Sequence, residues 1–537
     1  MRRRKWRSGI VRKYVAVEGV SLLFALFCGM TYQGEDGSLH FAVCFLAFSI
    51  CGIIGILCVP FLKRIWITEK LIIWNKRIDE TAGRVLTNRK FFLLVWIILT
   101  VCWVPAYLAW FPGIFGYDVP IQMLHLFGEN MLTSHHPLFH TWLLGIFVKL
   151  GELIQNNNGA YALFTALQML AVTGSLACSF TFLKKRRVPF PILLFMILWV
   201  IQNPILQTLT FNGTKDILFG VCMLLFSISF WELVEPLETL KKGAYINVFL
   251  SGICMCLFRN QGIYMVIALT ALCLFSRTRP RKFYGCMTGI VICYILFNLV
   301  CVDIIKIPKG DAREMLSVPM QQMAAVGYYR ITGKGGKISE EQLQILENII
   351  PEEYILAWEP VSADAVKKGF NTEEFKLHFF RYLKNYIQIG LQNPGIYWGA
   401  VKNMIRPYWD MMYNGFRPLM YMNTFPQWNT WGIEQKSLLE SYKERLMYKV
   451  GMDKISVWNQ PAVSIWCMTA LAGVAYGRKK RTVLLGSLTP ILYFGTILLG
   501  PVALLRYTYP LILAEPLLAG MLFRSLCGAT EGRGGTI

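Results

Sequence analysis

The chain of 537 residues is 55% hydrophobic and 16% charged, and its mean hydropathy is +0.44. This composition is too apolar for a soluble protein of that length and indicates a membrane protein. The net charge of +22 does not indicate nucleic-acid binding, because the basic residues form short runs between long apolar spans, the pattern that orients membrane helices.

Apolar spans of roughly 20 residues, long enough to cross a bilayer, recur along the chain. They begin near Tyr14, His40, Phe91, Ala160, Phe190, Lys215, Phe283, Pro461, Thr482 and Leu511, and two shorter spans flank Arg259. No small-residue cleavage site follows the first span, so we expect it to be a retained helix instead of a signal peptide. The pattern predicts an all-α polytopic membrane protein with about 12 transmembrane helices.

The basic runs predict how these helices are oriented. If MRRRKWR is cytoplasmic, the alternation of spans also places KRIWITEK, KKRR (184–187), LKKG, SRTRPRK and RKKR (478–481) inside. This scheme requires that the segment from Leu138 to about Ile154 lies along the outer surface or re-enters, because a full crossing would invert every later loop. We therefore expect both termini to be cytoplasmic and all candidate chemistry to be external.

Four parts of the chain follow from this topology. Residues 1–90 hold the N-terminal helices and a basic cytoplasmic loop, residues 91–302 a transmembrane core with an external loop at 112–159, residues 303–459 an external and mainly helical region, and residues 460–537 the C-terminal transmembrane helices. In the external region, Ser339 opens a capping box in ISEEQLQILENII, and NTEEFKLHFFRYLKNYIQIGLQ predicts one helix from Asn371 to the NPG sequence.

The first external loop is unusually rich in titratable side chains. GYDVPIQMLHLFGENMLTSHHPLFH holds Asp118, Glu129 and four of the six histidines of the chain. A carboxylate at the rim of a low-dielectric pocket can act as a general base or bind a cation, although Asp118 could also form a turn or cap a helix. The candidates in HHPLFH are His135, His136 and His140, which could orient a phosphate, hold a metal ion or fill a structural role. His136 and His140 are four residues apart, so we expect them on one face of the helix that follows.

Three further motifs place polar residues at the outer ends of predicted helices. Arginine at such a site suits a bidentate hold on phosphate, whereas snorkelling at the interface or helix capping is the alternative. The residues are Lys215 and Asp216 in NGTKDIL, Arg259 and Asn260 in FRNQG, and Arg506 and Tyr507 in LLRYTYP.

An acid soon after a helix exit, followed by an HHP element and a surface helix, resembles the membrane glycosyltransferases of the GT-C superfamily. The motifs PGIFGYDVPIQ, HHPLFHTW, NGTKDILF, FRNQGIY, SVPMQQ and RYTYP resemble, more narrowly, an uncharacterised bacterial family of polytopic membrane proteins, domain of unknown function 6020. This narrow resemblance covers most of the chain from about Phe91 onward.

The resemblance implies a GT-C-like enzyme of the cytoplasmic membrane. It would move a sugar from a polyprenyl-phosphate carrier to an extracytoplasmic acceptor, with Asp118 as the general base and the other candidates binding substrate or phosphate. Several GT-C members carry two adjacent carboxylates where this chain has Asp118 between Tyr117 and Val119. A role for a divalent cation is therefore left open.

Two other classes of protein compete with the enzyme. A transporter or flippase of lipid-linked glycans would carry polar groups near the middle of its spans, and Glu18 and Glu515 fall within or near such spans. A structural or regulatory membrane protein is the third class.

Overall fold

The computed structural model describes residues 21–26, 87–116, 118–128, 131–236, 242–275, 281–411, 413, 429–451, 456 and 458–527. These residues are predominantly helical, and within them β-structure is confined to isolated bridges such as Ile114 with Asn212. The expected helical membrane class is confirmed to that extent. Glu18, Glu129 and most of the two N-terminal spans lie outside the described residues.

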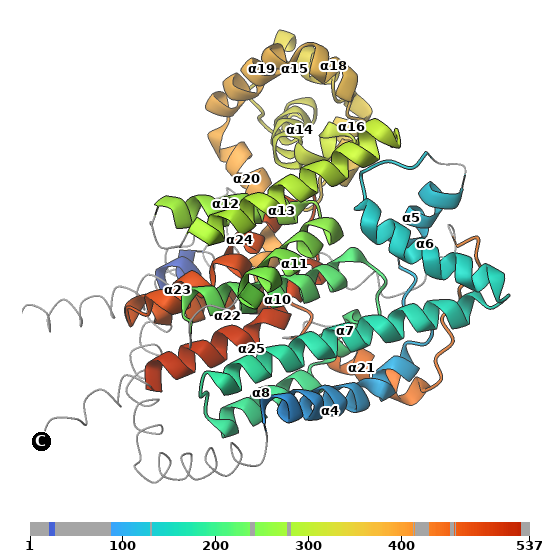
Figure 1. Cartoon of the computed structure of the whole chain (residues 1–537). Coiled ribbons are helices and arrows are strands. Elements are labelled where there is room, and N and C mark those ends of the chain that lie inside the picture. The colour runs from blue at the N-terminus through green and yellow to red at the C-terminus, as the bar shows by residue number, and fades with distance from the viewer. Residues whose placement is uncertain are drawn as a thin grey trace, which may run out of the picture.

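Within the described residues, four helical stretches are long and apolar enough to cross a membrane. They are α4 (Asn88–Ala109), α7 (Asn157–Lys185), α10 (Lys215–Val234) and the stretch Arg281–Ile304, which comprises α13 (Arg281–Leu299) and the π-helix η1 (Val300–Ile304). Shorter apolar helices accompany them, namely α8 (Phe190–Gln202), α11 (Lys242–Phe258), α12 (Gln261–Phe275), α22 (Pro461–Gly477) and α24 (Leu488–Ile497). The long helix α25 (Leu505–Cys527) packs against α10 and α22 (Figure 1).

Two of the predicted spans are broken into shorter pieces. The span from Phe190 ends at Gln202, and a separate short helix, α9 (Pro204–Leu209), follows because Pro204 cannot continue the hydrogen bonding of the first helix. The span from Thr482 consists of α23 (Arg481–Gly486) and α24, divided at Ser487. About 12 crossings therefore stays a prediction.

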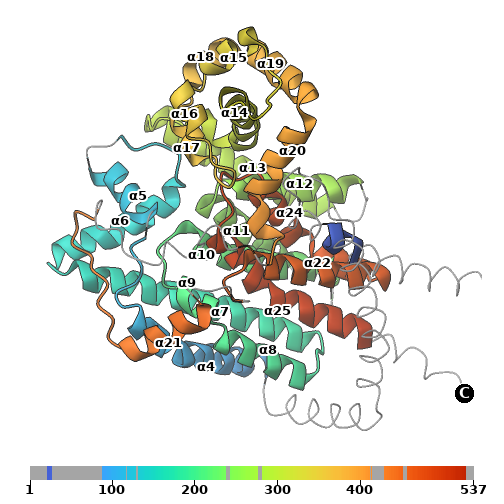
Figure 2. The same cartoon turned by 180° about the vertical axis from the view of Figure 1, so that it is seen from behind.

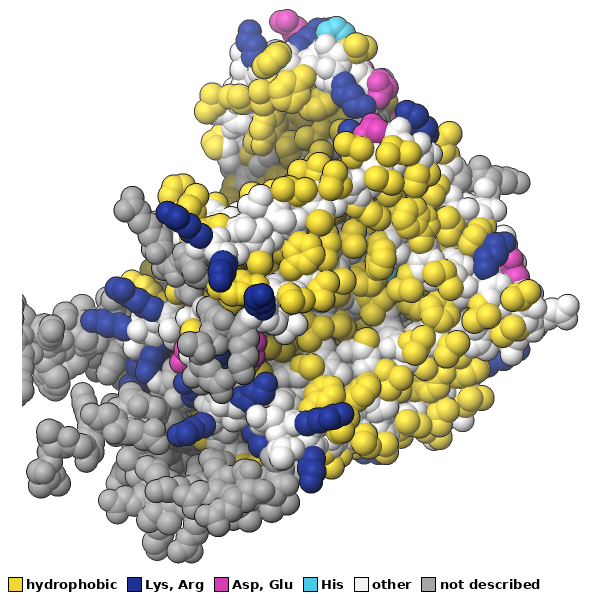
Figure 3. Space-filling model, in the orientation of Figure 1, with side chains coloured by type: hydrophobic (Ala, Val, Ile, Leu, Met, Phe, Trp, Pro, Cys, Tyr) yellow, Lys and Arg dark blue, Asp and Glu magenta, His cyan; other side chains and the backbone are white. Residues whose placement is uncertain are grey.

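Opposite ends of the helix bundle carry different chemistry. At one end, the C-terminal parts of α7, α10 and α25 meet where Glu235 faces Arg186 at 3.7 Å and Arg524 at 2.7 Å. Figure 3 shows basic side chains at this end and a broad hydrophobic surface over the helices. The N-terminal ends of α10 and α25, with Lys215 and Arg506, lie at the other end. This separation agrees with chemistry on one side of a membrane, although the sidedness itself remains a prediction.

The region after η1 forms a compact helical unit beside α12 and α13. Helix α14 (Ser317–Ile331) is surrounded by α15 (Glu340–Glu347), α16 (Glu352–Leu356), α17 (Asp364–Lys368), α18 (Thr372–Leu377), α19 (Phe379–Gln392) and α20 (Pro394–Met404), as Figures 1 and 2 show. Two 3-10 turns, η2 (Ala312–Met315) and η3 (Arg406–Tyr408), flank it. The core of this unit includes Met320, Leu346 and Tyr382.

Both local predictions for this unit can be checked. The capping box is confirmed, because the Ser339 side chain accepts from the Gln342 backbone and the Gln342 side chain accepts from the Ser339 backbone. The single helix predicted from Asn371 is wrong: the chain breaks at His378 into α18 and α19. Its expected end before Asn393 is correct.

The last part of the predicted external region returns to the C-terminal end of α4. The Lys436 backbone donates to the Phe111 carbonyl at 2.8 Å, and the Leu438 backbone donates to the Leu108 carbonyl at 2.9 Å. Helix α21 (Glu440–Val450) then packs on α4 and α9. This segment therefore braces the exit of α4, from which the loop with Asp118 begins.

Candidate functional site

Five charged side chains, far apart in the sequence, form a buried network that we call the charged cluster. Its members are Asp118, Lys215, Asp216, Arg259 and Arg506. Arg506 Nη1 lies 2.8 Å from Asp118 Oδ2, and Lys215 Nζ lies 3.7 Å from the same oxygen. Asp216 pairs with Arg259 and lies 3.8 Å from Arg506 Nε. Three positive and two negative charges leave a formal net charge of +1.

Several helices begin at or beside this cluster. Asp118 is the first residue of α5 (Asp118–Phe127), Lys215 is the first of α10, and Arg506 is the second of α25. Arg259 lies in the turn before α12. The N-terminus of a helix carries a partial positive charge, so these ends add to the net charge of the cluster. The site is therefore electrostatically suited to an anion.

Lys215 forms the most accessible part of the cluster. Its side chain is 16% exposed, against 8% for Asp118 and 7% for Arg506. Lys215 Nζ donates to His136 Nδ1 at 3.2 Å, and burial, together with the charge of Lys215, holds the pKa of His136 well below its usual range. A neutral imidazole thus accepts from the ammonium group and fixes its direction.

Asp118 is ionised in this setting. Burial alone raises the pKa of its carboxyl group, but the positive charges of Arg506 and Lys215 outweigh burial and leave the pKa well below its usual range. A carboxylate so strongly stabilised is a weak base while both cations face it. The sequence shows no basic neighbour of Asp118, because Lys215 and Arg506 come from distant helices.

The loop before Lys215 is held against the exit of α4. Ile114 N donates to the Phe211 carbonyl at 2.8 Å, and Gly213 N donates to the Ile114 carbonyl at 3.2 Å. A Cβ atom at position 213 would meet the hydroxyl group of Tyr161, so a side chain there would displace this hydroxyl from its hydrogen bond to the Ile114 carbonyl. These contacts set the position of Lys215 relative to Asp118.

His140 has a positioning role. Its Nδ1 lies 2.9 Å from Gln122 Oε1, to which Thr141 Oγ1 also donates at 3.1 Å. This contact fastens α5, which carries Asp118, to α6 (Leu138–Leu153). Burial lowers the pKa of His140 to about 3, so the ring is neutral at physiological pH. His136 precedes α6, so the expectation that His136 and His140 share one helix face is wrong.

The remaining predicted residues surround the cluster to different degrees. Arg506 Nη2 donates to the Tyr507 hydroxyl at 3.4 Å, and the Arg259 guanidinium lies 4.9 Å from the centroid of the Tyr507 ring. Asn260 is exposed and donates to the Ser134 carbonyl at 3.4 Å, which connects it to the first loop. Tyr493 was missed: its hydroxyl accepts from Arg259 at 3.1 Å and donates to the Tyr507 carbonyl at 2.8 Å.

The helical unit of α14–α20 reaches the site through the turn η2, whose Glu314 contacts His135. The His135 ring lies 4.5 Å from that of His136, and its Nδ1 lies 3.9 Å from Glu314 Oε1. Lys367 Nζ in turn donates to Glu314 Oε2 at 2.6 Å. The unit thus borders the first loop at its histidines, a contact that no local sequence signal indicates.

A protein metal centre receives little support from the described side chains. Among them, no group of three or more histidine, cysteine, aspartate and glutamate residues is arranged to hold a metal ion. His136 faces the ammonium group of Lys215, which competes with a cation at that nitrogen. In the charged cluster, Asp118 is the carboxylate that could bind a metal ion together with a bound substrate.

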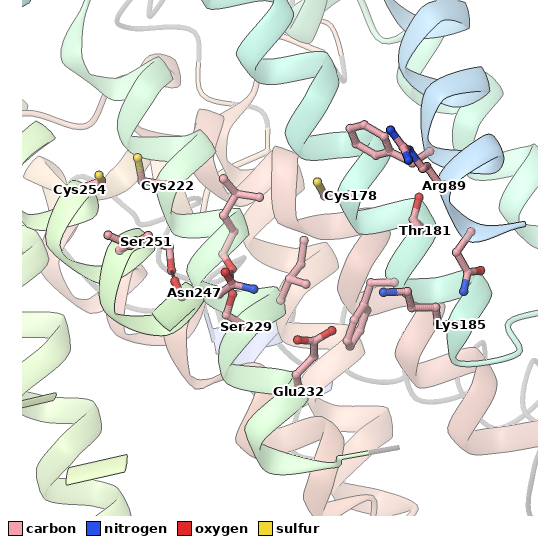
Figure 4. Close-up of a pocket in the computed structure, with 16 residues that line it drawn as sticks. Arg89, Cys178, Thr181, Lys185, Cys222, Ser229, Glu232, Asn247, Ser251 and Cys254 are labelled. Atoms are coloured by element: carbon pink, nitrogen blue, oxygen red, sulfur yellow. Dashed lines mark hydrogen bonds between the residues drawn. The ribbon is translucent and has the colours of Figure 1, made fainter. Parts of the chain in front are cut away.

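Two cavities lie between the membrane helices. One, of about 610 Å³, runs between α4, α7, α10 and α11; Figure 4 shows Cys222 and Cys254 at one side of it and Arg89, Lys185 and Glu232 around the rest. The other, of about 550 Å³, lies between α8, α22 and α25. Its lining is mainly apolar but includes Glu515, and it also includes Leu505, the neighbour of Arg506.

The helices and the buried cluster define a helical membrane protein with a positively charged polar site at one end of its bundle. A model described as family of unknown function DUF6020 matches residues 127–530. The chain belongs to this family. The matched part contains Lys215, Asp216, Arg259 and Arg506 and begins shortly after Asp118. No curated protein and no solved structure matches the chain.

Proposed function

We propose that this protein is a GT-C-like membrane glycosyltransferase that moves a sugar from a polyprenyl-phosphate carrier to an extracytoplasmic acceptor. The observation that carries the proposal is the charged cluster, in which an ionised Asp118 lies between Arg506 and Lys215. Such a site combines a proton acceptor with cations suited to a phosphate leaving group.

The electrostatics of the cluster support phosphate as the bound group. A buried net positive charge is costly in a low-dielectric environment unless an anion compensates it. The guanidinium of Arg506 contributes a positive charge beside Asp118, and Lys215 adds a point charge on the more exposed side. A phosphate entering past Lys215 would therefore complete the charge balance.

Phosphate binding would also activate the base. As the anion attracts the charges of Arg506 and Lys215, it weakens their hold on Asp118, and its own charge raises the proton affinity of the carboxylate. The acceptor hydroxyl then attacks the anomeric carbon and forms the new C–O bond. Its proton passes to Asp118, while the bond from the sugar to the phosphate breaks and the carrier phosphate leaves with the electron pair.

The cavity between α8, α22 and α25 supports a lipid-linked donor. Phe195, Trp199 and Leu471 contribute to its apolar lining, and Leu505 joins this lining to the start of α25. Because Arg506 follows Leu505, an isoprenoid chain in the cavity would hold its phosphate near the cluster. The proposed reaction uses this apolar cavity only if the sugar donor carries a lipid chain, so the cavity favours a lipid-linked donor.

The test is the Asp118→Asn variant in a transfer assay with purified full-length protein and a polyprenyl-phosphate-linked sugar. Asparagine preserves size but cannot accept the proton, so the rate of transfer should fall by about 100-fold or more. The affinity for the donor should not fall, because the substitution removes a negative charge from the cluster. Transfer at the wild-type rate would rule out Asp118 as the base.

One observation favours a transporter or flippase as the second candidate. Glu515 lies in the middle of α25 and lines the apolar cavity, and acids at that depth often belong to ion-coupled transport. Glu515→Gln separates the two functions. A transporter should lose movement of lipid-linked glycan in vesicles, whereas the glycosyltransferase should retain transfer, because glutamine keeps the size of this cavity-lining side chain and the proposed reaction needs no proton or charge there.

A further inference from the structure

Helix α19 presents a hydrophobic face that the rest of the described chain leaves uncovered. Tyr382, Asn385 and Ile389 are buried against the unit. On another face of the same helix, Phe380 is 82% exposed, Leu391 is 78% exposed, and Phe379, Leu383 and Ile387 are also exposed. At 100° per residue these five side chains occupy a contiguous arc of roughly 120°.

A cationic edge borders this apolar face. Arg381 and Lys384 are exposed on the third side of α19, next to Gln388. The helix therefore has one face in the protein core, one apolar face and one basic face. An apolar face flanked by lysine and arginine is the pattern of helices that lie in the plane of a lipid interface, where the cations meet phosphate groups.

The position of the helix also favours lipid as its neighbour. The unit follows η1 and α13, and α13 carries exposed Ile292, Ile295 and Leu296 as a lipid-facing helix would. In Figure 3, hydrophobic side chains appear on the unit where Figure 1 places α19 and α20, above the hydrophobic surface of α12 and α13. Trp398 of α20, 57% exposed, extends the apolar surface with an indole typical of membrane interfaces.

We infer that α19 is an interfacial anchor: Phe379, Phe380, Leu383, Ile387 and Leu391 enter the membrane leaflet in which α13 ends, while Arg381 and Lys384 contact its headgroup phosphates. The bilayer is thus the partner of this face. The anchor holds the unit of α14–α20 at a fixed depth, and with it Glu314 and Lys367, which border His135 of the first loop. The inference does not depend on the proposed reaction.

The test uses full-length protein in nanodiscs with an environment-sensitive fluorescent amino acid at position 380 or 391. Both side chains are exposed, so the probe needs no repacking of the core. Position 341, an exposed glutamate of α15 in the same unit, is the control. Lipids with brominated acyl chains should quench the probes at 380 and 391 at least threefold more than the probe at 341, and their emission should be shifted to shorter wavelength.

Two results would overturn the anchor. If soluble iodide quenches the probes at 380 and 391 as strongly as the probe at 341, the face lies in water. If the emission at 380 and 391 is shifted but brominated lipids do not quench it, protein covers the face. Either result excludes lipid as the partner of α19.

Discussion

The pairing of Asp118 with Arg506 predicts strong energetic coupling between two residues that are 388 positions apart. Asp118→Asn alone leaves Arg506 buried with a weaker partner, Asp216, at 3.8 Å. Arg506→Gln alone leaves Asp118 buried with a weaker partner, Lys215, at 3.7 Å. Removing one member of a buried ion pair lowers the free energy of unfolding by about 3–5 kcal/mol. Because each remaining charge keeps one partner, we expect the loss in each single variant to be about 3 kcal/mol. The double variant should lose about 1.5–3 kcal/mol less free energy of unfolding than the two single variants lose together.

The assay is a double-mutant cycle on the free energy of unfolding of the full-length protein, measured in mixed micelles by titration with a denaturing detergent. Arg330 and Glu340 provide a matched control, because their atoms are also 2.8 Å apart but the side chains are 47% and 74% exposed. Their coupling should be only about 0.2–1 kcal/mol. Equal coupling in the two pairs would refute the buried geometry of Asp118 and Arg506.

Two further outcomes are expected. Because the pKa of His140 is about 3 in the folded protein, against about 6.5 when unfolded, acidification below pH 6.5 favours the unfolded state by about 1.4 kcal/mol per pH unit, or about 2 kcal/mol at pH 5. His140→Gln should remove this part of the pH dependence of unfolding, and an unchanged slope would argue against a neutral buried ring. A topology reporter after Arg187 should be cytoplasmic and one near Gly335 external, whereas an external signal after Arg187 would mean that α6 crosses the membrane.

The sequence predicts local structure well where one short-range rule decides it. The start of α15 follows from its cap at Ser339, and the start of α10 at Lys215 follows from the onset of an apolar run. The breaks at Asn203 and His378 were not predicted. Pro204 accounts for the first break by a local rule. The apolar pattern continues through His378, so the second break depends on how the two halves pack against the rest of the protein.

The candidate site shows the same division between local and long-range information. Motifs at helix ends identify four polar residues at membrane boundaries, Asp118, Lys215, Arg259 and Arg506. They do not indicate that these residues form one network, which only the tertiary structure shows. Tyr493 lies within an apolar helix and carries no local signal of its contact with Arg259. The effect of Lys215 and Arg506 on the pKa of Asp118 likewise requires the tertiary structure.

Binding of a polyprenyl phosphate to the protein in nanodiscs, measured by native mass spectrometry, tests most directly whether the charged cluster is a phosphate site. Lys215→Met should weaken binding by about 10- to 100-fold, the loss of one charge-assisted contact, while Asp118→Asn should leave binding unchanged or tighter. Lys149→Met, which removes an exposed lysine of α6, is the control and should bind as the wild type does. Wild-type affinity in Lys215→Met, or equal weakening by Lys215→Met and Asp118→Asn, would contradict a phosphate site at this cluster.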